Sequence, residues 1–554
     1  MDLGGAWTFK IDPNDVGVQE GWYSGIDGGC TVTVPSTWNN ELGLLNYTGK
    51  AWYEKRFYTR GGTLLFEFES VMTEASVYFD GKPVGEHYGA FTQFYVTVND
   101  VEEGEHSLVV CADNRQNSQS IPQPRVDWFN YGGIARDVYV HRLEGVSILS
   151  NRVKYELTSD FKNARVWSEL ELYNGENREV ASLVSVCVGD TCIYEGEITL
   201  GAREARTFET PCVEMNGVSL WSVEDPCLYT VTAKTETDDL IDKMGFRHVE
   251  VKGTRVLLNG KEISFRGVNR HEEHPDWGFA FPQKLMKKDI DLILEMGCNT
   301  VRGSHYPQSR VFLDMLDSSG ILFWSEIPIW GGGFPDTVLT DPVVFERGLQ
   351  MHREMTKYYY NHPSIIIWGM HNEIYTPYPC TYDYSREYSK HLRKDGGNRL
   401  ITHAAAFPFE DSSMEFDDII CINMYKGWYD GGVELWDEFV KKFGEHRVKT
   451  GQDKKPVIIS EFGAGALYGY HSYFDELRWS EEYQSDLLKY CIELFDKTDY
   501  IVGYYVWQFC NIRTAPQMNI NRARSFNNKG ILDEYRNPKA AYFTVKKLNE
   551  KVFR

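Results

Sequence analysis

The sequence contains no run of about eighteen apolar residues, which a membrane-spanning helix requires. Its first ten residues, MDLGGAWTFK, lack both the basic stretch and the apolar stretch of a secretory signal peptide. We therefore expect a cytoplasmic protein. The alternative is that a signal peptide once preceded this sequence and was removed.

Positive charge is scarce. The chain has 58 Lys and Arg against 80 Asp and Glu, a formal net charge of -22. Such a chain gains no counterion-release energy on a phosphate backbone and is not attracted to an anionic membrane surface. We expect neither nucleic acid nor membrane as a partner.

Paired CxxC spacing, the usual sign of a cysteine metal site, is absent. The 11 cysteines are odd in number and scattered along the chain. We expect them to be reduced thiols.

With 554 residues, 42% hydrophobic and 14% aromatic, the chain is long enough for several cores. Residues 1–145 show short alternating runs, LLFEFES (64–70) and ASVYFDGKPVGEH (75–87), in which Asp80-Gly81 predicts a hairpin turn. This pattern predicts a jelly-roll-like β-sandwich. In 146–248 the alternation continues with polar turns and no convincing helix, as in an immunoglobulin-like β-sandwich.

Residues 249–554 combine strands with helical periodicity, clearest at 283–297 and 309–320. Eight apolar runs with helical crossovers between them match a (β/α)8 TIM barrel, whose active site lies at the carboxyl ends of its strands. The eight predicted strands are 263–269, 299–305, 321–327, 365–371, 400–406, 419–425, 457–462 and 502–509.

A glutamate lies at the carboxyl end of two of these runs: in IIIWGMHNE, Glu373 follows the fourth strand, and in PVIISEFG, Glu461 lies at the end of the seventh. Both carboxylates should emerge at one rim of the barrel. A retaining glycosidase needs such a pair, one as acid/base and one as nucleophile. A single glutamate after a strand more often caps a helix or forms a surface ion pair, but a matched pair favours catalysis.

Neighbouring polar residues fit this chemistry. Asn372 could bind a sugar hydroxyl, and Arg302, at the end of the second strand, could hold Glu461 ionised through a fork-like contact. Trp507, on the eighth predicted strand, could form a platform for the face of a sugar.

The longer segments around both glutamates, NHPSIIIWGMHNE (361–373) and KPVIISEFGAGALYGYHS (455–472), resemble the two signatures of glycoside hydrolase family 2. The resemblance extends along the whole chain, through VPSTWN (34–39), FNYGGIAR (129–136), WSVEDPCLYTV (221–231), GFRHVEV (245–251) and GVNRHEEHP (267–275). It implies retaining hydrolysis with Glu373 as acid/base and Glu461 as nucleophile, no cofactor, and a homotetramer or homodimer.

Within that family, FNNKGILDEYRNPKAAYF (526–543) is similar to the segment with which β-glucuronidases bind the sugar's C6 carboxylate. The resemblance gives that role to Asn527 and Lys529, which would reject a neutral hexose because it leaves a charged group unpaired. The alternative is an ordinary turn.

The resemblance implies further sugar-pocket residues. CINMYKGWY (421–429) places Tyr425 near the glutamates and Tyr429 near the carboxylate, Asp127 would reach sugar hydroxyls from the first domain, and His305 and His271 would surround the pocket. The alternatives are core packing for the aromatic residues, a loop cap for Asp127 and structural roles for the histidines. A metal site at His271, Glu273 and His274 is disfavoured, because consecutive residues point in different directions and this reaction needs no metal.

Several positions depart from the β-glucuronidase pattern. These are Lys426, Ile374 and His371, and GVNRHEEHP is closer to the β-galactosidase version of its segment. These departures leave open which configuration at C4 of the sugar the enzyme prefers. We therefore expect an exo-β-glucuronidase, with a β-galacturonidase or dual hexuronidase as the alternative and a neutral β-galactosidase next. A carbohydrate-binding protein without turnover would retain the aromatic residues and lack one carboxylate.

The segment after the third strand, SEIPIWGGGFPDT (325–337), is short. It predicts an open site that accepts aglycones larger than a small phenol.

Overall fold

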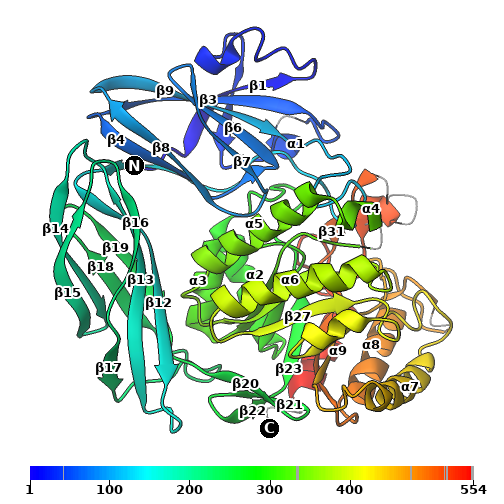
Figure 1. The fold of residues 1–554 in the computed structure, drawn as a ribbon. Coiled ribbons are helices and arrows are strands. Elements are labelled where there is room, and N and C mark those ends of the chain that lie inside the picture. The colour runs from blue at the N-terminus through cyan, green and yellow to red at the C-terminus, as the bar shows by residue number, and fades with distance from the viewer. Residues whose placement is uncertain (42, 332–335, 475–476, 517, 519–521, 551–554) are drawn as a thin grey trace.

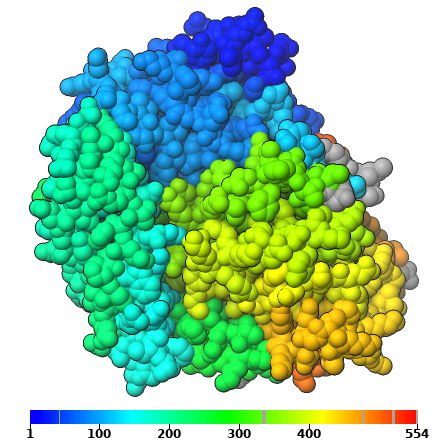
Figure 2. All heavy atoms as spheres, viewed as in Figure 1, coloured from blue at the N-terminus to red at the C-terminus, as the bar shows by residue number. Residues whose placement is uncertain are grey.

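The structure is a computed structural model that describes residues 1–554 except 42, 332–335, 475–476, 517, 519–521 and 551–554. Two β-sandwiches lie against a barrel (Figure 1). In the space-filling view the three parts form three adjoining lobes (Figure 2). In the described part of the chain, no helix is long and apolar enough to span a membrane.

The N-terminal sandwich packs one six-stranded sheet against smaller sheets, around a core that includes Trp7, Phe66 and Val110. The six strands in spatial order are β2 (Cys30–Val34), β1 (Gly5–Asp12), β3 (Lys50–Thr59), β9 (Gly104–Asp113), β6 (Glu74–Phe79) and β7 (Lys82–Tyr88). The others are β11 (Val138–Leu143), β4 (Gly62–Phe68), β8 (Phe94–Val101), and the pair β10 (Gly133–Ile134) and β5 (Val71–Met72). Two short helices accompany them, η1 (Trp22–Ser24) and α1 (Trp38–Glu41).

The hairpin predicted at Asp80-Gly81 is confirmed, since β6 and β7 pair across it. Both residues have positive φ, 47° and 76°. This is the backbone that a type I′ turn requires and that Asp and Gly tolerate best.

The second sandwich consists of two sheets that enclose a core of alternating apolar residues, such as Leu170, Leu172 and Val186. One sheet contains β12 (Val146–Leu157), β13 (Asn163–Asn174), β16 (Ala205–Glu209) and β17 (Val213–Asn216). The other contains β15 (Thr191–Leu200), β14 (Val180–Val188), β18 (Tyr229–Lys234) and β19 (Asp239–Met244).

A small sheet lies beneath the barrel (Figure 1) and comprises β20 (Val249–Lys252), β21 (Arg255–Leu258) and β22 (Lys261–Ile263). The barrel itself closes through eight parallel strands, which are β23 (Phe265–Asn269), β24 (Thr300–Gly303), β25 (Leu322–Glu326), β26 (Ile365–Asn372), β27 (Leu400–Ala405), β28 (Ile420–Asn423), β29 (Val457–Phe462) and β30 (Ile501–Val506). Most of their residues are buried, as expected for strands covered on both faces.

Helices cover the outside of the barrel. They are α2 (Gln283–Glu295), α3 (Arg310–Ser319), α4 (Asp336–Leu339), α5 (Pro342–Tyr358), α6 (Pro379–Asp395), α7 (Leu435–Lys449), α8 (Glu481–Phe495) and α9 (Ala540–Glu550). Short elements in the loops are η2 (Ser412–Phe416), β31 (Ile512–Arg513), η4 (Ala523–Ser525) and β32 (Phe526–Asn527).

The predicted fold class and all eight predicted barrel strands are confirmed, with ends that shift by a few residues. The largest shift is at the eighth strand, predicted for 502–509, because β30 ends at Val506. Trp507 therefore follows the strand, where the chain turns across the barrel mouth, and does not lie within it.

An aromatic cluster joins the N-terminal sandwich to the barrel. Trp128, Phe129 and Tyr131 of the sandwich pack with Phe279 and Tyr306 of the barrel loops. Tyr131 also donates a hydrogen bond to Glu273 at 2.7 Å. This contact brings the loop that carries Asp127 to the carboxyl ends of the barrel strands.

Candidate active site

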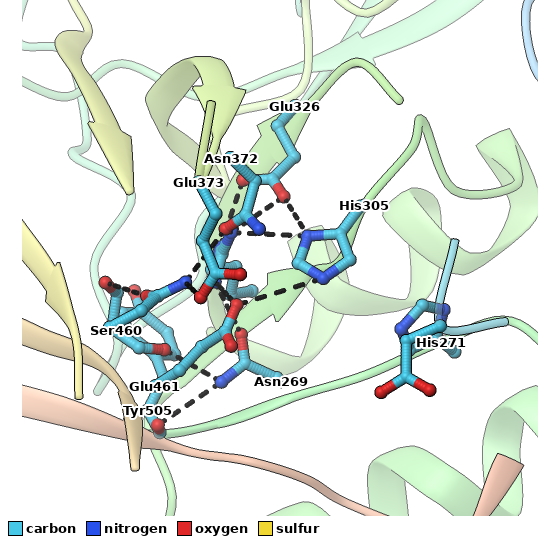
Figure 3. A network of polar contacts seen from close by, with 12 residues as sticks. Asn269, His271, His305, Glu326, Asn372, Glu373, Ser460, Glu461 and Tyr505 are labelled. Atoms are coloured by element: carbon cyan, nitrogen blue, oxygen red, sulfur yellow. Dashed lines mark hydrogen bonds and ion pairs between the residues drawn. The ribbon is translucent and has the colours of Figure 1, made fainter. Parts of the chain in front are cut away.

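Glu373 and Glu461 meet at one cavity. Glu373 directly follows β26, Glu461 lies in β29, and both line a cavity of about 350 Å³ at the mouth of the barrel. Their side chains extend toward each other (Figure 3). Because each follows a fully buried apolar run, the strands fix where these carboxylates emerge.

Glu461 is held by two donors. Arg302 on β24 donates from Nη1 to Oε1 at 2.8 Å, and the Tyr425 hydroxyl donates to Oε2 at 2.6 Å. Burial raises the pKa of Glu461, and both contacts oppose that rise because they stabilise the carboxylate. Such a carboxylate is poised for nucleophilic attack.

Glu373 has a different environment. Among the described residues, its Oε1 accepts one hydrogen bond, from Asn423 Nδ2 at 2.9 Å. Burial, together with the nearby Glu461 carboxylate, raises the pKa of Glu373 to about 8. At neutral pH this group retains a proton that it can donate, which is the requirement for a general acid.

Glu326, which sequence reasoning missed, completes the network behind Glu461. Arg302 binds it through two nitrogens, at 2.8 and 3.0 Å, so one guanidinium joins two buried carboxylates. Asn269 Oδ1 also accepts from Arg302, at 3.1 Å. Glu326 and Asn269 end β25 and β23, so the strand-end signal that identified Glu461 could have identified both.

Asn372 is held from one side only. Its Oδ1 accepts from Arg302 at 2.7 Å and from Asn423 at 3.0 Å. Its Nδ2 has no hydrogen-bond partner among the described residues. The amide therefore retains a donor, as binding of a sugar hydroxyl would require.

Of the two predicted histidines, His305 lies beside the glutamates, with Nε2 3.8 Å from Glu461 Oε1. His305 Nδ1 is 2.7 Å from Glu326, and its ring stacks on Trp507 with centroids 5.1 Å apart. His271 contacts the Tyr306 hydroxyl at 3.2 Å and lies farther to the side (Figure 3). Burial lowers the pKa of both rings well below the ordinary value, so both are neutral.

Lys529 and Tyr429 line the same cavity as the glutamate pair. Lys529 Nζ lies 2.8 Å from the Tyr429 hydroxyl, and the lysine is only 3% exposed. An ammonium group so far from bulk water stabilises an anion placed beside it.

Asp127, from the N-terminal sandwich, also lines this cavity. It accepts from Arg522 at 2.6 and 3.2 Å and from Asn527 Nδ2 at 2.8 Å. Asn527 is thus fully buried against Asp127, and only Asp127 and Arg522 of these three line the cavity. Sequence reasoning missed Arg522, for which no local pattern exists.

The remaining predicted features are placed as follows. His271 and Glu273 contact different tyrosines, Tyr306 and Tyr131, and do not converge on one point. Lys426 forms an ion pair at 2.8 Å with Asp430, which lines the cavity. The segment predicted to leave the site open falls partly, at 332–335, outside the described residues.

Profiles of known families match the three parts of the chain. "Glycosyl hydrolases family 2, sugar binding domain" matches residues 1–143, "Glycosyl hydrolases family 2" matches 146–247, and "Glycosyl hydrolases family 2, TIM barrel domain" matches 249–553.

Individual proteins are similar over nearly the whole chain. A β-glucuronidase of Paenibacillus borealis is 28% identical, covering 98% of this chain and 95% of its own. A crystal structure of a β-galacturonidase from Eisenbergiella tayi bound to galacturonate has a TM-score of 0.92 at 32% identity, covering 100% and 97%. The structure of Ruminococcus gnavus β-glucuronidase has a TM-score of 0.88 at 26% identity, covering 100% and 97%.

The barrel profile alone spans more than half of the sequence, and the fold has the same three parts in the same order. The chain belongs to glycoside hydrolase family 2 and is a glycosidase.

Proposed function

We propose that this enzyme is a retaining exo-β-hexuronidase whose first substrate class is β-D-glucuronides. One observation carries the proposal: the buried Lys529 ammonium lines the same cavity as Glu373 and Glu461. The cavity therefore combines a glycosidase carboxylate pair with a cation suited to an acidic sugar.

The reaction proceeds in two displacements. Glu461 attacks the anomeric carbon while Glu373 donates its proton to the glycosidic oxygen, so the glycosidic bond breaks as the glycosyl-enzyme ester forms. Glu373, now a carboxylate, takes a proton from water as that water attacks the same carbon. Glu461 leaves and the β-configured sugar is released.

Selectivity for a uronide follows from charge. Lys529 and Tyr429 would donate to the C6 carboxylate, and we add Arg522, which lines the same wall. Asn527 would act through Asp127, to which it is hydrogen-bonded. A neutral hexose would leave the Lys529 ammonium buried without an anionic partner, at a cost of about 1–3 kcal/mol.

β-Galacturonides are the second candidate class. They carry the same C6 carboxylate and differ at C4, so Lys529 would also bind them. The similarity to the Eisenbergiella tayi β-galacturonidase supports this candidate. A neutral β-galactosidase would make no use of the buried ammonium.

The test measures initial rates on 4-nitrophenyl β-glucuronide, β-galacturonide and β-galactoside, for the wild type and for Lys529→Ala. We expect a uronide to be preferred, and Lys529→Ala to remove most of that preference. The matched control is Lys546→Ala, because Lys546 pairs with Glu295 on the outer helices. A preference for the galactoside, unchanged in Lys529→Ala, would show that the substrate class is wrong.

A further inference from the structure

A second cavity adjoins the catalytic one. It has a volume of about 650 Å³, and its walls include Trp428, Tyr429, Arg478, Trp479, Met518 and Arg522. Tyr429, Met518 and Arg522 line both cavities, so the two share a wall. The retaining mechanism uses none of the residues found only in the second cavity.

The position of Lys529 relates the second cavity to the sugar that the catalytic cavity would bind. Its Nζ lies 2.8 Å from the Tyr429 hydroxyl, 5.0 Å from the centre of the Tyr429 ring and 5.8 Å from that of Trp428. The ammonium thus faces the two rings that form one side of this cavity. If Lys529 holds the sugar's C6 carboxyl group, the cavity begins directly beyond C6.

The aglycone would lie on the other side of the catalytic cavity. Glu373 must protonate the glycosidic oxygen, so the leaving group would lie on the Glu373 side, where Asn423 and Ala406 also line the catalytic cavity. The second cavity instead includes Tyr429, which contacts Lys529, and Arg522, which contacts Asp127. A group in it would therefore be attached to the sugar and would not be released with the aglycone.

The walls suit a planar aromatic group. Trp428 and Trp479 meet edge to face, with centroids 5.0 Å apart and planes at 81°, and form a corner of two indoles. Tyr429, which also lines this cavity, is 58% exposed, so its ring has surface available to a bound group. The Arg478 guanidinium lies 5.8 Å from the Trp428 ring and can also cover an aromatic face.

We propose that this cavity is a binding subsite for a planar aromatic substituent carried on the C6 carboxyl group, so that β-uronides amidated at C6 are also substrates. The inference rests on the proposed uronide specificity. An amide loses the negative charge of the carboxylate and so, like a neutral hexose, leaves the Lys529 ammonium without an anionic partner. Its carbonyl oxygen still accepts a hydrogen bond from Lys529, and burial of the aromatic group offsets part of the lost charge interaction. The aromatic group leaves water for the indole corner, which favours binding.

The experiment compares three substrates with the same 4-nitrophenyl leaving group: the β-uronide preferred by the wild type, its primary C6 amide and its C6 N-benzylamide. The primary amide loses the same charge but places nothing in the cavity. We expect kcat/KM for the benzylamide to exceed that for the primary amide by about tenfold, from burial of one ring.

Two variants locate the effect. Trp479→Ala and Arg478→Ala should each reduce the ratio of benzylamide to primary amide and leave the rate on the parent uronide unchanged. Arg478 is exposed, so its variant remains informative if Trp479→Ala folds poorly. Trp277→Ala, which removes a tryptophan that is 47% exposed and lines neither cavity, should leave the ratio intact.

The outcomes separate the two proposals. If the wild type cleaves the parent uronide but the benzylamide is no better than the primary amide, or its advantage survives in both variants, the subsite is refuted and the uronidase stands. If the parent uronide is not cleaved in preference to a galactoside, the proposed function itself fails, and with it the basis of the subsite.

Discussion

Arg302 shows how much of this site depends on one residue. It is fully buried, its guanidinium contacts Glu461 and Glu326, and its charge lies 4.6 Å from the Trp324 ring. One positive charge is thus shared between two carboxylates in a region away from water. Glu373 has no cation at hydrogen-bond distance among the described residues, so the two glutamates have different electrostatic surroundings.

The pH dependence of activity should report this difference. The pKa of Glu373 is about 8, so kcat/KM should fall as pH rises through 8 and the acid loses its proton. On the acidic side, activity should fall as Glu461 becomes protonated, above the ordinary value of 4.5 because burial raises its pKa. A pH–rate profile measures both limbs. Activity that stays constant from pH 7 to 10 would contradict the assignment of Glu373 as the acid.

The same shift predicts how Glu373 affects stability. Its native pKa is raised above the ordinary value of 4.5, so the native state holds the Glu373 proton more tightly than the unfolded chain does. The resulting contribution to the free energy of unfolding is fully present below pH 4.5 and is lost as pH rises through 8. Glu373→Gln should therefore lose less stability than the wild type between pH 5 and 9. Denaturant unfolding at several pH values measures the difference between the two proteins, which cancels the other titrating groups.

Arg302→Met should destabilise the enzyme by about 3–5 kcal/mol, because it leaves Glu326 and Glu461 buried without their cation. It should also raise the pKa of Glu461 and move the acidic limb of any residual activity to higher pH. Arg353→Met is the control, since Arg353 forms an exposed ion pair with Glu346 and should change stability by less than about 1 kcal/mol. Equal effects of both substitutions would contradict the buried network.

Among the elements, the two glutamates of the candidate site lie where strands end. β26 and β29 are buried along their whole length, and Glu373 and Glu461 appear at their carboxyl ends. This is why the strand runs could predict the pair. Helix ends also determine contacts, because the residues that follow a helix can pack against the neighbouring part of the chain.

Gly320, which follows α3, tests one such contact. It has a φ of +68°, and a Cβ there would lie 2.3 Å from the carbonyl oxygen of Val223. Gly451, beyond the end of α7, has a φ of +71° and no atom within 4 Å of a Cβ. Both alanine variants incur the left-handed backbone cost of about 1–2 kcal/mol, but only Gly320→Ala also displaces Val223.

We therefore expect Gly320→Ala to be less stable than Gly451→Ala by a further 1–3 kcal/mol, roughly the cost of an overpacked site. Denaturant unfolding of the two variants gives the difference directly. Equal stabilities would mean that the Val223 segment moves away freely, so that this contact between the α3 end and the chain before the barrel contributes little.

In the molecule as a whole, side-chain contacts join each sandwich to the barrel. Asp127 reaches the catalytic cavity from the N-terminal sandwich and pairs with Arg522 of the barrel. At the opposite end, buried Arg247 donates to the carbonyls of Pro363 at 3.1 Å and Ile365 at 2.8 Å, and so ties the chain leaving the second sandwich to the base of β26.

Arg247→Met should weaken that attachment. The substitution leaves these two carbonyls buried without their donor, each at a cost of about 1–3 kcal/mol. We expect the unfolding transition to begin at lower denaturant or to separate into two steps, followed by circular dichroism and tryptophan fluorescence. Arg165→Met, which removes an exposed pair with Glu156 in the second sandwich, is the control. A single transition unchanged from the wild type would contradict a structural role for Arg247.

The three-part architecture, the eight barrel strands and the glutamate pair could be predicted from the amino-acid sequence. Each depends on local patterns: alternation within a strand, apolar runs of buried strands, and residues at strand ends. Burial on both faces imposes these patterns residue by residue, so they can be read without knowledge of distant contacts.

The surroundings of the glutamate pair depend instead on long-range packing. Asp127 meets Arg522 because the sandwich packs on the barrel mouth. Arg302 meets Glu326 and Glu461 because closure of the eight-stranded barrel brings the carboxyl ends of β24, β25 and β29 together. The second cavity likewise arises where Tyr429, Arg478 and Arg522 come together from different barrel loops. Such contacts join side chains far apart in the chain, and docking and barrel closure, not any local pattern, determine which of them meet.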